Sequence, residues 1–172
     1  GTFCYHSHKK DRNYFIGKLS HNTLKVDRKN QAKIGGPTLW LDHYDCSVEK
    51  SFSDRNIDYI KAKHNGYKDN NVIHIREFKF NRHELELTII DDIIINDDKQ
   101  HTIEIPFHLH PRVKVSALSD NIYKASIHNT GNLIFNFQDN YERKIIKGRK
   151  DPILGWYSKS FYKKAPCPVI YT

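Results

Sequence analysis

The chain has 172 residues, and Lys plus Arg outnumber Asp plus Glu by 28 to 20, so the formal net charge is +8. Apolar residues make up 38% and aromatic residues 12%, which excludes a disordered chain. No run approaches the roughly 18 apolar residues of a membrane helix, so no membrane insertion is expected. The charge favours an anionic partner such as nucleic acid, an acidic polysaccharide or a membrane surface, without choosing among them.

Strand patterns dominate from the middle of the chain onward. Apolar and polar residues alternate in short runs separated by turn residues, and no convincing amphipathic helix of 11 or more residues is present. Asn65-Gly66 is a turn dipeptide and predicts a reversal there. The pattern predicts an all-β fold, an antiparallel multi-stranded β-sandwich that occupies residues 1–172 as one domain. The main predicted runs are 38–52, 57–63, 72–80, 85–91, 102–105, 113–115, 123–127 and 133–137.

Two segments need separate predictions. The run from Ile89 to Ile95 is very apolar and β-branched, which favours a central strand with a bend at Asp91-Asp92. The segment from Lys163 to Thr172 holds Pro166 and Pro168, and proline cannot donate to a sheet ladder. It is therefore predicted to be an edge strand or a wrapped extension.

Several histidines could carry chemistry. His6 and His8 would share one face of an extended segment and could bind a transition metal, but a solvated basic segment is the simpler interpretation. His108 and His110 would share one strand face, and a polar outward face is the simpler interpretation there. His21 stands at the start of a short alternating strand, where a hydrogen-bonded loop histidine is common.

Other catalytic and binding patterns are weak. The sequence has no nucleophile elbow and no phosphate-binding glycine loop. The three cysteines, Cys4, Cys46 and Cys167, are too widely spaced for a zinc knuckle, and one disulfide or three buried free thiols are both open. A basic cluster at 144–150 precedes aromatic residues at 157–162, but no known RNA- or DNA-binding pattern is present, so no nucleic-acid partner is predicted.

Three stretches together resemble the heparinase II/III-like polysaccharide lyases. Residues 21–27, His-Asn-Thr-Leu-Lys-Val-Asp, with Gln31 further on, are similar to the family's metal-site histidine segment. Residues 104–111 are similar to a family strand that ends in His-Leu-His-Pro, and residues 153–158 to a Gly-Trp-Tyr-Ser segment near the family's C-terminus. The matches occur in order and span nearly the whole chain.

The resemblance implies an architecture and a reaction. Family members join an N-terminal α/α toroid to a C-terminal antiparallel β-sandwich, and they cleave uronate-containing polysaccharides by β-elimination. Many hold zinc in the sandwich through two His and an Asp. By this resemblance His21 is a metal ligand, and Tyr5 and Arg12 are candidates for substrate binding. Gly1-Thr2 is similar to the residues just after the metal Asp, which would place that Asp and the toroid upstream.

The sequence therefore predicts the C-terminal sandwich of a lyase that acts on an anionic polysaccharide, inactive when isolated because the catalytic toroid is missing. Zinc is the expected cofactor, with an incomplete site in this chain. Polymer substrates imply a periplasmic or extracellular location. The alternative is a non-catalytic carbohydrate-binding or scaffold sandwich that uses Trp40, Trp156 and Tyr157 as platforms, although core burial is more common for Trp in strands.

Overall fold

The computed structural model describes residues 2–139 and 141–172. Strands make up 51% of the chain and helix 8%, and every strand pair recorded among the described residues is antiparallel. The predicted all-β antiparallel class is therefore confirmed, and it is consistent with a sandwich. The chain divides into two compact units, unit 1 (Gly1–Asn30 and Thr102–Thr172) and unit 2 (Gln31–His101). A single sandwich domain over residues 1–172 stays a prediction.

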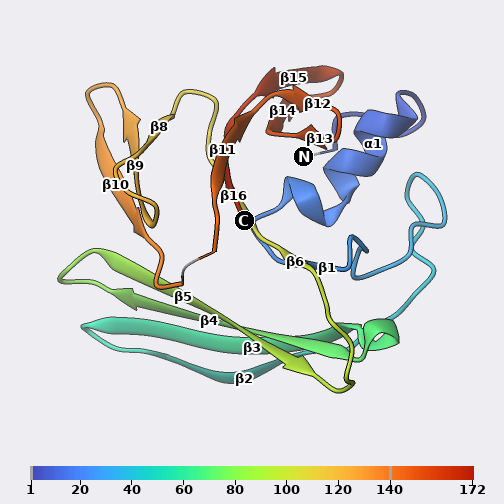
Figure 1. Ribbon diagram of the computed structural model, residues 1–172, viewed down its shortest axis with the longest axis horizontal. Helices are drawn as coiled ribbons and strands as arrows, with labels where there is room; N and C mark the ends of the chain where they lie inside the picture. The colour runs from blue at the N-terminus through green and yellow to red at the C-terminus, as the bar shows by residue number, and fades with distance from the viewer. Residues whose placement is uncertain (1, 140) are drawn as a thin grey trace. The chain divides into compact units, whose positions relative to one another are not determined.

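Unit 1 begins with a short helical segment and continues into small antiparallel sheets (Figure 1). Helix α1 spans Lys9–Ile16 and is followed by the 3-10 turn η1, Lys18–Ser20. Strand β1 pairs with β6, β9 lies between β10 and β8, and β16 lies between β11 and β7, while β12 pairs with β13 and β14 with β15. The strand bounds are β1 Lys25–Val26, β6 Ile103–Glu104, β7 Pro106–His108, β8 Lys114–Ala117, β9 Ile122–Ile127, β10 Gly131–Asn136, β11 Lys144–Lys147, β12 Arg149–Lys150, β13 Ile153–Leu154, β14 Trp156–Ser160, β15 Lys163–Pro166 and β16 Pro168–Tyr171.

The core of unit 1 gathers around α1. Tyr14 and Phe15 are buried on the helix, and the Tyr14 hydroxyl accepts hydrogen bonds from the backbone N–H groups of Gly155 and Trp156, each at 3.2 Å. Gly155 has φ of +79°, and a Cβ there would lie 2.9 Å from the Cys167 carbonyl oxygen, so the turn between β13 and β14 requires glycine. The two hydrogen bonds to the Tyr14 hydroxyl connect α1 to this turn. The buried cluster consists of Phe3, Cys4, Tyr14, Phe15, Leu154, Cys167 and Val169.

The C-terminal tail agrees with its prediction in one part and differs in the other. Among the described residues β15 pairs with β14 alone, so it is an edge strand as predicted, whereas β16 is not. Strand β16 is the middle strand of its sheet, and Val169 and Ile170 are 0% and 1% exposed. Its proline causes no conflict because Pro168 is the first strand residue, so the following residues supply the ladder N–H groups, while the Pro168 carbonyl accepts from the Leu109 N–H at 2.9 Å.

Unit 2 contains a four-stranded antiparallel meander, β2 (Cys46–Ser53), β3 (Ile57–Tyr67), β4 (Val72–Asn81) and β5 (Glu86–Ile95), paired in that order (Figure 1). The predicted turn at Asn65-Gly66 is wrong, because both residues lie inside β3. The reversal is made instead by the 3-10 turn η2, Lys68–Asn70, and by Asn71, whose φ of 55° is left-handed. Asparagine tolerates that conformation better than most residues.

Strand β5 also differs from its prediction. Within the described residues it pairs with β4 alone, so it is an edge strand and not a central one. Asp91 and Asp92 form no bend, since the pairing runs unbroken from Val72 opposite Ile95 to Asn81 opposite Glu86. A charged residue can remain inside this apolar strand because the Asp91 carboxylate is bound by side chains of β4.

Candidate functional site

The two predicted substrate-binding residues lie together in unit 1. Arg12 extends from α1, and its guanidinium carbon lies 5.4 Å from the centroid of the Tyr5 ring. An Arg12 terminal N–H donates to the Thr2 carbonyl at 3.3 Å, which restrains the side chain, and Tyr5 is 42% exposed. The structure thus forms a cation–π pair on an accessible face. Whether this pair binds substrate stays a prediction.

Further aromatic and basic side chains extend from this pair. The Phe161 ring lies 5.4 Å from Tyr5 and 5.0 Å from Tyr162, and both Phe161 and Tyr162 are at least half exposed. The Lys164 ammonium lies 4.8 Å from the Trp156 ring centroid. We call this set the aromatic–basic strip. Its members are Tyr5, Arg12, Phe161, Tyr162, Lys164 and Trp156.

Lys164 has a fixed position in the strip. Its ammonium donates to the Asp11 carboxylate at 2.5 Å and lies 5.5 Å from the Phe3 ring centroid, and Phe3 in turn contacts Tyr162 with ring centroids 6.1 Å apart. A row of contacting aromatic rings therefore lies between two cations, Arg12 of α1 and Lys164 of β15. Such a surface can place apolar faces against sugar rings and cations against their anionic groups.

His21, the predicted metal ligand, follows η1 and lies near a second histidine. The positive charge of His21 lowers the pKa of His108, although burial is the larger cause of that shift. Partial burial is also the main cause of the lowered pKa of His21, with the charge of Lys18 adding to it. Both shifts favour the neutral ring, which is the form that metal coordination requires.

The described residues do not form a complete zinc site. Within residues 2–139 and 141–172, no three His, Cys, Asp or Glu side chains gather closely enough to hold a metal ion. His108 already donates from Nε2 to the Leu19 carbonyl at 2.7 Å. A catalytic zinc site needs three protein ligands. His21 as a ligand stays a prediction, and Gly1, which marks the resemblance to the metal Asp segment, lies outside the described residues.

The other histidine predictions have different outcomes. His6 and His8 do not form an extended pair, because residues 5–7 bend and His8 has a left-handed φ of 51° where it precedes α1. Both residues are exposed, in agreement with the simpler interpretation of a solvated basic segment. His108 does not face outward, since its ring is hydrogen-bonded to Leu19. It also does not share a strand face with His110, because β7 ends at His108. The His110 ring is exposed and lies 5.3 Å from Tyr157.

Of the three rings proposed as platforms, Trp40 and Tyr157 are exposed, whereas Trp156 is partly buried. Trp40, in unit 2, is 46% exposed. The Trp156 indole N–H donates to the Arg149 carbonyl at 2.9 Å, and its ring packs against the core of unit 1.

All three cysteines are free, but Cys46 is exposed, so the option of three buried thiols is wrong.

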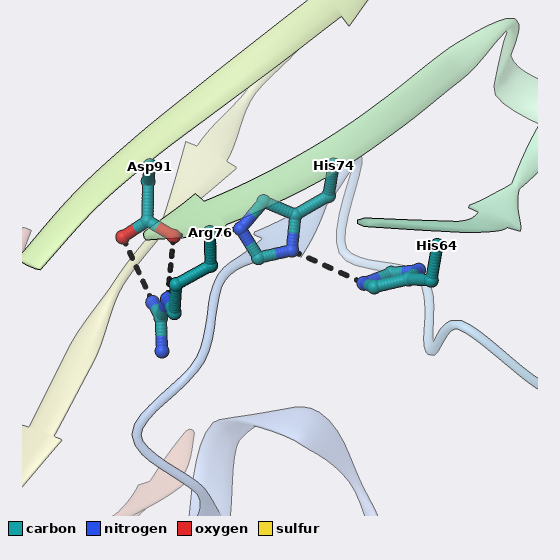
Figure 2. A network of polar contacts seen from close by, with 4 residues as sticks. All are labelled: His64, His74, Arg76 and Asp91. Atoms are coloured by element: carbon teal, nitrogen blue, oxygen red, sulfur yellow. Dashed lines mark hydrogen bonds and ion pairs between the residues drawn. The ribbon is translucent and has the colours of Figure 1, made fainter. Parts of the chain in front are cut away.

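Unit 2 contains a polar network that the sequence did not reveal (Figure 2). The Asp91 carboxylate accepts two bonds from Arg76, from Nε at 2.6 Å and from a terminal nitrogen at 2.8 Å, and one from His74 Nε2 at 2.6 Å. His74 Nδ1 lies 3.1 Å from His64 Nε2. The Gly66 N–H donates to His64 Nδ1 at 3.1 Å, so His64 Nε2 is the donor toward His74.

This network stabilises the sheet and does not form a catalytic centre. All four ring nitrogens of His64 and His74 have hydrogen-bond partners, which leaves none to bind a metal or to accept a substrate proton. Burial raises the pKa of Asp91, but the bonds from His74 and Arg76 outweigh burial and hold the pKa below its ordinary value. A pairing register, which single-strand patterns do not provide, is the signal that would have found this network.

The two units differ in net charge. Unit 1 contains 18 Lys and Arg against 7 Asp and Glu, whereas unit 2 contains 10 against 13. The net positive charge of the chain therefore resides in unit 1, which also carries the aromatic–basic strip. An anionic ligand would be attracted to that unit.

The sequence pattern of the Heparinase II/III-like, C-terminal family matches residues 1–170. The chain belongs to this family. The match covers nearly the whole chain, so the resemblance drawn from the three sequence stretches is confirmed. No curated protein matches the chain. In the described parts of the chain, no helix is both long and apolar enough to cross a membrane.

Solved structures share the fold. The heparan sulfate lyase HepC from Pedobacter heparinus superimposes with a TM-score of 0.75 at 18% identity, and the match covers 100% of this chain and 25% of that one. A heparinase III gene product superimposes with a TM-score of 0.75 at 16% identity, covering 99% of this chain and 24% of that one. The chain thus spans about a quarter of the length of these two structures.

Proposed function

We propose that this chain is the C-terminal sandwich portion of a polysaccharide lyase, which acts by β-elimination on an anionic, uronate-containing polysaccharide, and that unit 1 binds the polymer. The observation that carries the proposal is the aromatic–basic strip on the unit that contains 18 basic and 7 acidic residues. Family membership supports it, as do the two solved structures, which bear the names of a heparan sulfate lyase and a heparinase.

The residues of the strip suit this role chemically. The Arg12 guanidinium can form two parallel hydrogen bonds to a carboxylate or sulfate, and it lies against an aromatic ring that can contact the apolar face of a sugar. β-Elimination also needs a base for the C5 proton and an acid for the leaving oxygen. We assign those groups to the parent enzyme upstream of this chain, chiefly to its toroid, and we assign the further zinc ligands beside His21 to the upstream part of the sandwich. Such an enzyme would act in the periplasm or outside the cell.

Binding to heparan sulfate tests the role of unit 1. The wild-type chain should bind the immobilised polymer, and added salt should weaken binding because it screens exposed charges. Arg12→Gln should lower the affinity about tenfold through loss of charge-assisted hydrogen bonds. Arg55→Gln, which removes an exposed arginine of unit 2, should leave the affinity unchanged. Melting curves of both variants serve as folding controls.

Three results would contradict this role. One is equal affinity of Arg12→Gln and wild type. A second is displacement of heparan sulfate by DNA of matched charge density, which would favour a nucleic-acid binder. Binding to uncharged dextran that matches binding to heparan sulfate would also show that charge is not recognised.

Turnover tests the assignment of the chemistry to another part of the protein. The isolated chain, incubated with several uronate polymers, should produce no increase in the ultraviolet absorbance of unsaturated chain ends. Turnover that depends on this chain would show that it contains its own base and acid. Binding without turnover by the parent protein would favour the alternative, a non-catalytic carbohydrate-binding sandwich.

A further inference from the structure

A pocket of about 260 Å³ adjoins the aromatic–basic strip in unit 1. We propose that this pocket binds a single sulfated sugar residue, as a subsite separate from the Tyr5–Arg12 pair. The proposal rests on the proposed function, because it assumes that unit 1 meets an anionic polysaccharide. We call it the lysine–indole pocket. It is lined by Lys10, Asp11, Lys150, Ile153, Trp156 and Lys164.

The indole of Trp156 is fixed in place and forms an apolar wall. Its N–H donates to the Arg149 carbonyl at 2.9 Å, and its ring packs against the buried cluster of unit 1. Ile153 adds a second apolar surface. Because the indole is already oriented by its own hydrogen bond, a sugar ring could contact it without the entropic cost of ordering that side chain.

Two of the three lysines can serve an incoming anion. Lys164 is held by Asp11 at 2.5 Å, so these two charges satisfy each other. Lys10 pairs with Asp151 at 3.3 Å, but the two side chains are 65% and 88% exposed, and exposed pairs of this kind contribute little. Lys150 has no ion-pair partner in the described part of the chain. Lys10 and Lys150 therefore provide two ammonium groups at the pocket for one anionic group.

The type of cation favours sulfate over carboxylate. A planar carboxylate is best matched by the flat fork of arginine, and no arginine lines this pocket. Lysine ammonium groups act as compact point charges, each with three donors, and they suit the several oxygens of a tetrahedral oxyanion. The Arg12 guanidinium beside Tyr5 can bind either a carboxylate or a sulfate, so the preference for sulfate is assigned to the lysine–indole pocket alone.

The size and position of the pocket fit one residue of a polymer. Its volume of about 260 Å³ is below the range of roughly 300 to 1,000 Å³ typical of sites that hold whole drug-sized ligands. Trp156 and Lys164 belong to both the pocket and the strip, so a chain lying along the strip would reach the pocket with a neighbouring sugar.

Tryptophan fluorescence provides a direct test. The chain has two tryptophans, so Trp40→Phe leaves Trp156 as the only fluorescent indole, and Trp40 lies in the other unit. In that background, a sulfated disaccharide from heparan sulfate should change the emission and saturate. The unsulfated disaccharide with the same backbone should bind at least about tenfold more weakly, as expected when charge-assisted hydrogen bonds are lost.

Variants show whether the pocket is responsible. In the Trp40→Phe background, Lys10→Gln with Lys150→Gln should weaken binding of the sulfated disaccharide about tenfold or more. Lys159→Gln removes an exposed lysine of β14 that does not line the pocket, and it should leave binding unchanged. Unfolding curves confirm that each variant is folded. Unchanged affinity in the double variant would overturn the proposal that the pocket binds the sulfated sugar.

The two proposals fail in different ways. If heparan sulfate polymer binds but the sulfated disaccharide does not alter Trp156 emission, the pocket is wrong and polymer binding by unit 1 stands. If the sulfated and unsulfated disaccharides bind equally, the preference for sulfate is overturned. If neither polymer nor disaccharide binds, both proposals fall.

Discussion

Unit 1 buries a cluster of aromatic, aliphatic and thiol side chains around α1, whereas unit 2 is built on one four-stranded sheet in which a charged network is buried. In unit 1, Leu154 and Val169 are fully buried. In unit 2, Leu87 and Ile90 of β5 are about half exposed, while His74 is 3% exposed. Unit 1 is thus stabilised more by apolar packing, and unit 2 more by polar bonds that depend on strand register.

The units also differ in charge, and the total of +8 conceals this difference. Unit 2 contains 10 basic and 13 acidic residues, so its own charge does not favour a polyanion. Unit 1, with 18 basic and 7 acidic residues, carries both the aromatic–basic strip and the lysine–indole pocket. Net charge is therefore informative about a partner only after it is assigned to a part of the fold.

The largest expected effect is on the core of unit 1. Leu154→Ala removes a fully buried side chain from the cluster around α1 and should destabilise the unit by about 4 kcal/mol, through lost burial and a residual cavity. Urea unfolding followed by Trp156 fluorescence measures this loss, since Trp156 packs against the cluster.

Leu87→Ala in unit 2 is the matched control. Leu87 is 54% exposed, so this substitution should cost no more than about 0.5 kcal/mol. Equal costs for the two substitutions would refute the difference in packing between the units.

The next effect concerns the charged network of unit 2. Asp91→Asn removes the carboxylate that accepts bonds from Arg76 and His74, and it should destabilise the sheet by about 3 kcal/mol because the Arg76 guanidinium, which is 12% exposed, loses its ion pair with that carboxylate. The folded-state pKa of Asp91 lies below its unfolded value. Its stabilising contribution is therefore present above the unfolded pKa of about 4, and it is lost as pH falls through the folded-state pKa.

Urea unfolding of unit 2 as a function of pH tests this. Wild type should lose stability on acidification below about pH 4, and Asp91→Asn should lose less. Asp92→Asn, next to it on the strand, is the control: its pairing partner is Ile75 and its side chain is exposed, so it should resemble wild type. An identical acid dependence of Asp91→Asn and wild type would show that the network contributes no stability.

The strands were predictable where the alternation of apolar and polar residues was sufficient to identify them. Residues 72–80 alternate for most of their length, and β4 covers them all. Asn65-Gly66 misled because turn propensity is local, whereas the pairing of β3 with β4 is decided by the longer register. The same limitation applies to β5, because an apolar, β-branched run indicates a strand but not its position in a sheet.

The candidate site was predictable only in part. The resemblance named Tyr5 and Arg12, which the structure brings together, although their role is a proposal. Phe161 and Tyr162 belong to the aromatic run at 157–162 noted in the sequence, but the proximity of Lys164 to α1 joins residues about 150 positions apart, as in the Asp11–Lys164 pair. Pairs this distant leave no periodic signal in a single sequence. His64 and His74 were missed for the same reason, since only strand register places them face to face.

Substitution of the exposed cysteine has the smallest expected effect on stability, and the reactivity of the thiols can be measured directly. Cys46 in unit 2 is exposed, whereas Cys4 and Cys167 in unit 1 are 0% and 1% exposed. Burial is the main cause that raises the pKa of Cys167 to about 11, so little thiolate is available to react at pH 8.

A thiol-reactive dye should therefore label one cysteine rapidly in the native chain and all three in urea. Cys46→Ser should abolish the rapid phase while changing the free energy of unfolding by no more than about 0.5 kcal/mol. Cys4→Ser should leave the rapid phase intact, because a buried thiol reacts only when its surroundings open. Two rapidly labelled thiols in the native chain would mean that the core of unit 1 opens easily, which would remove the contrast in packing between the two units.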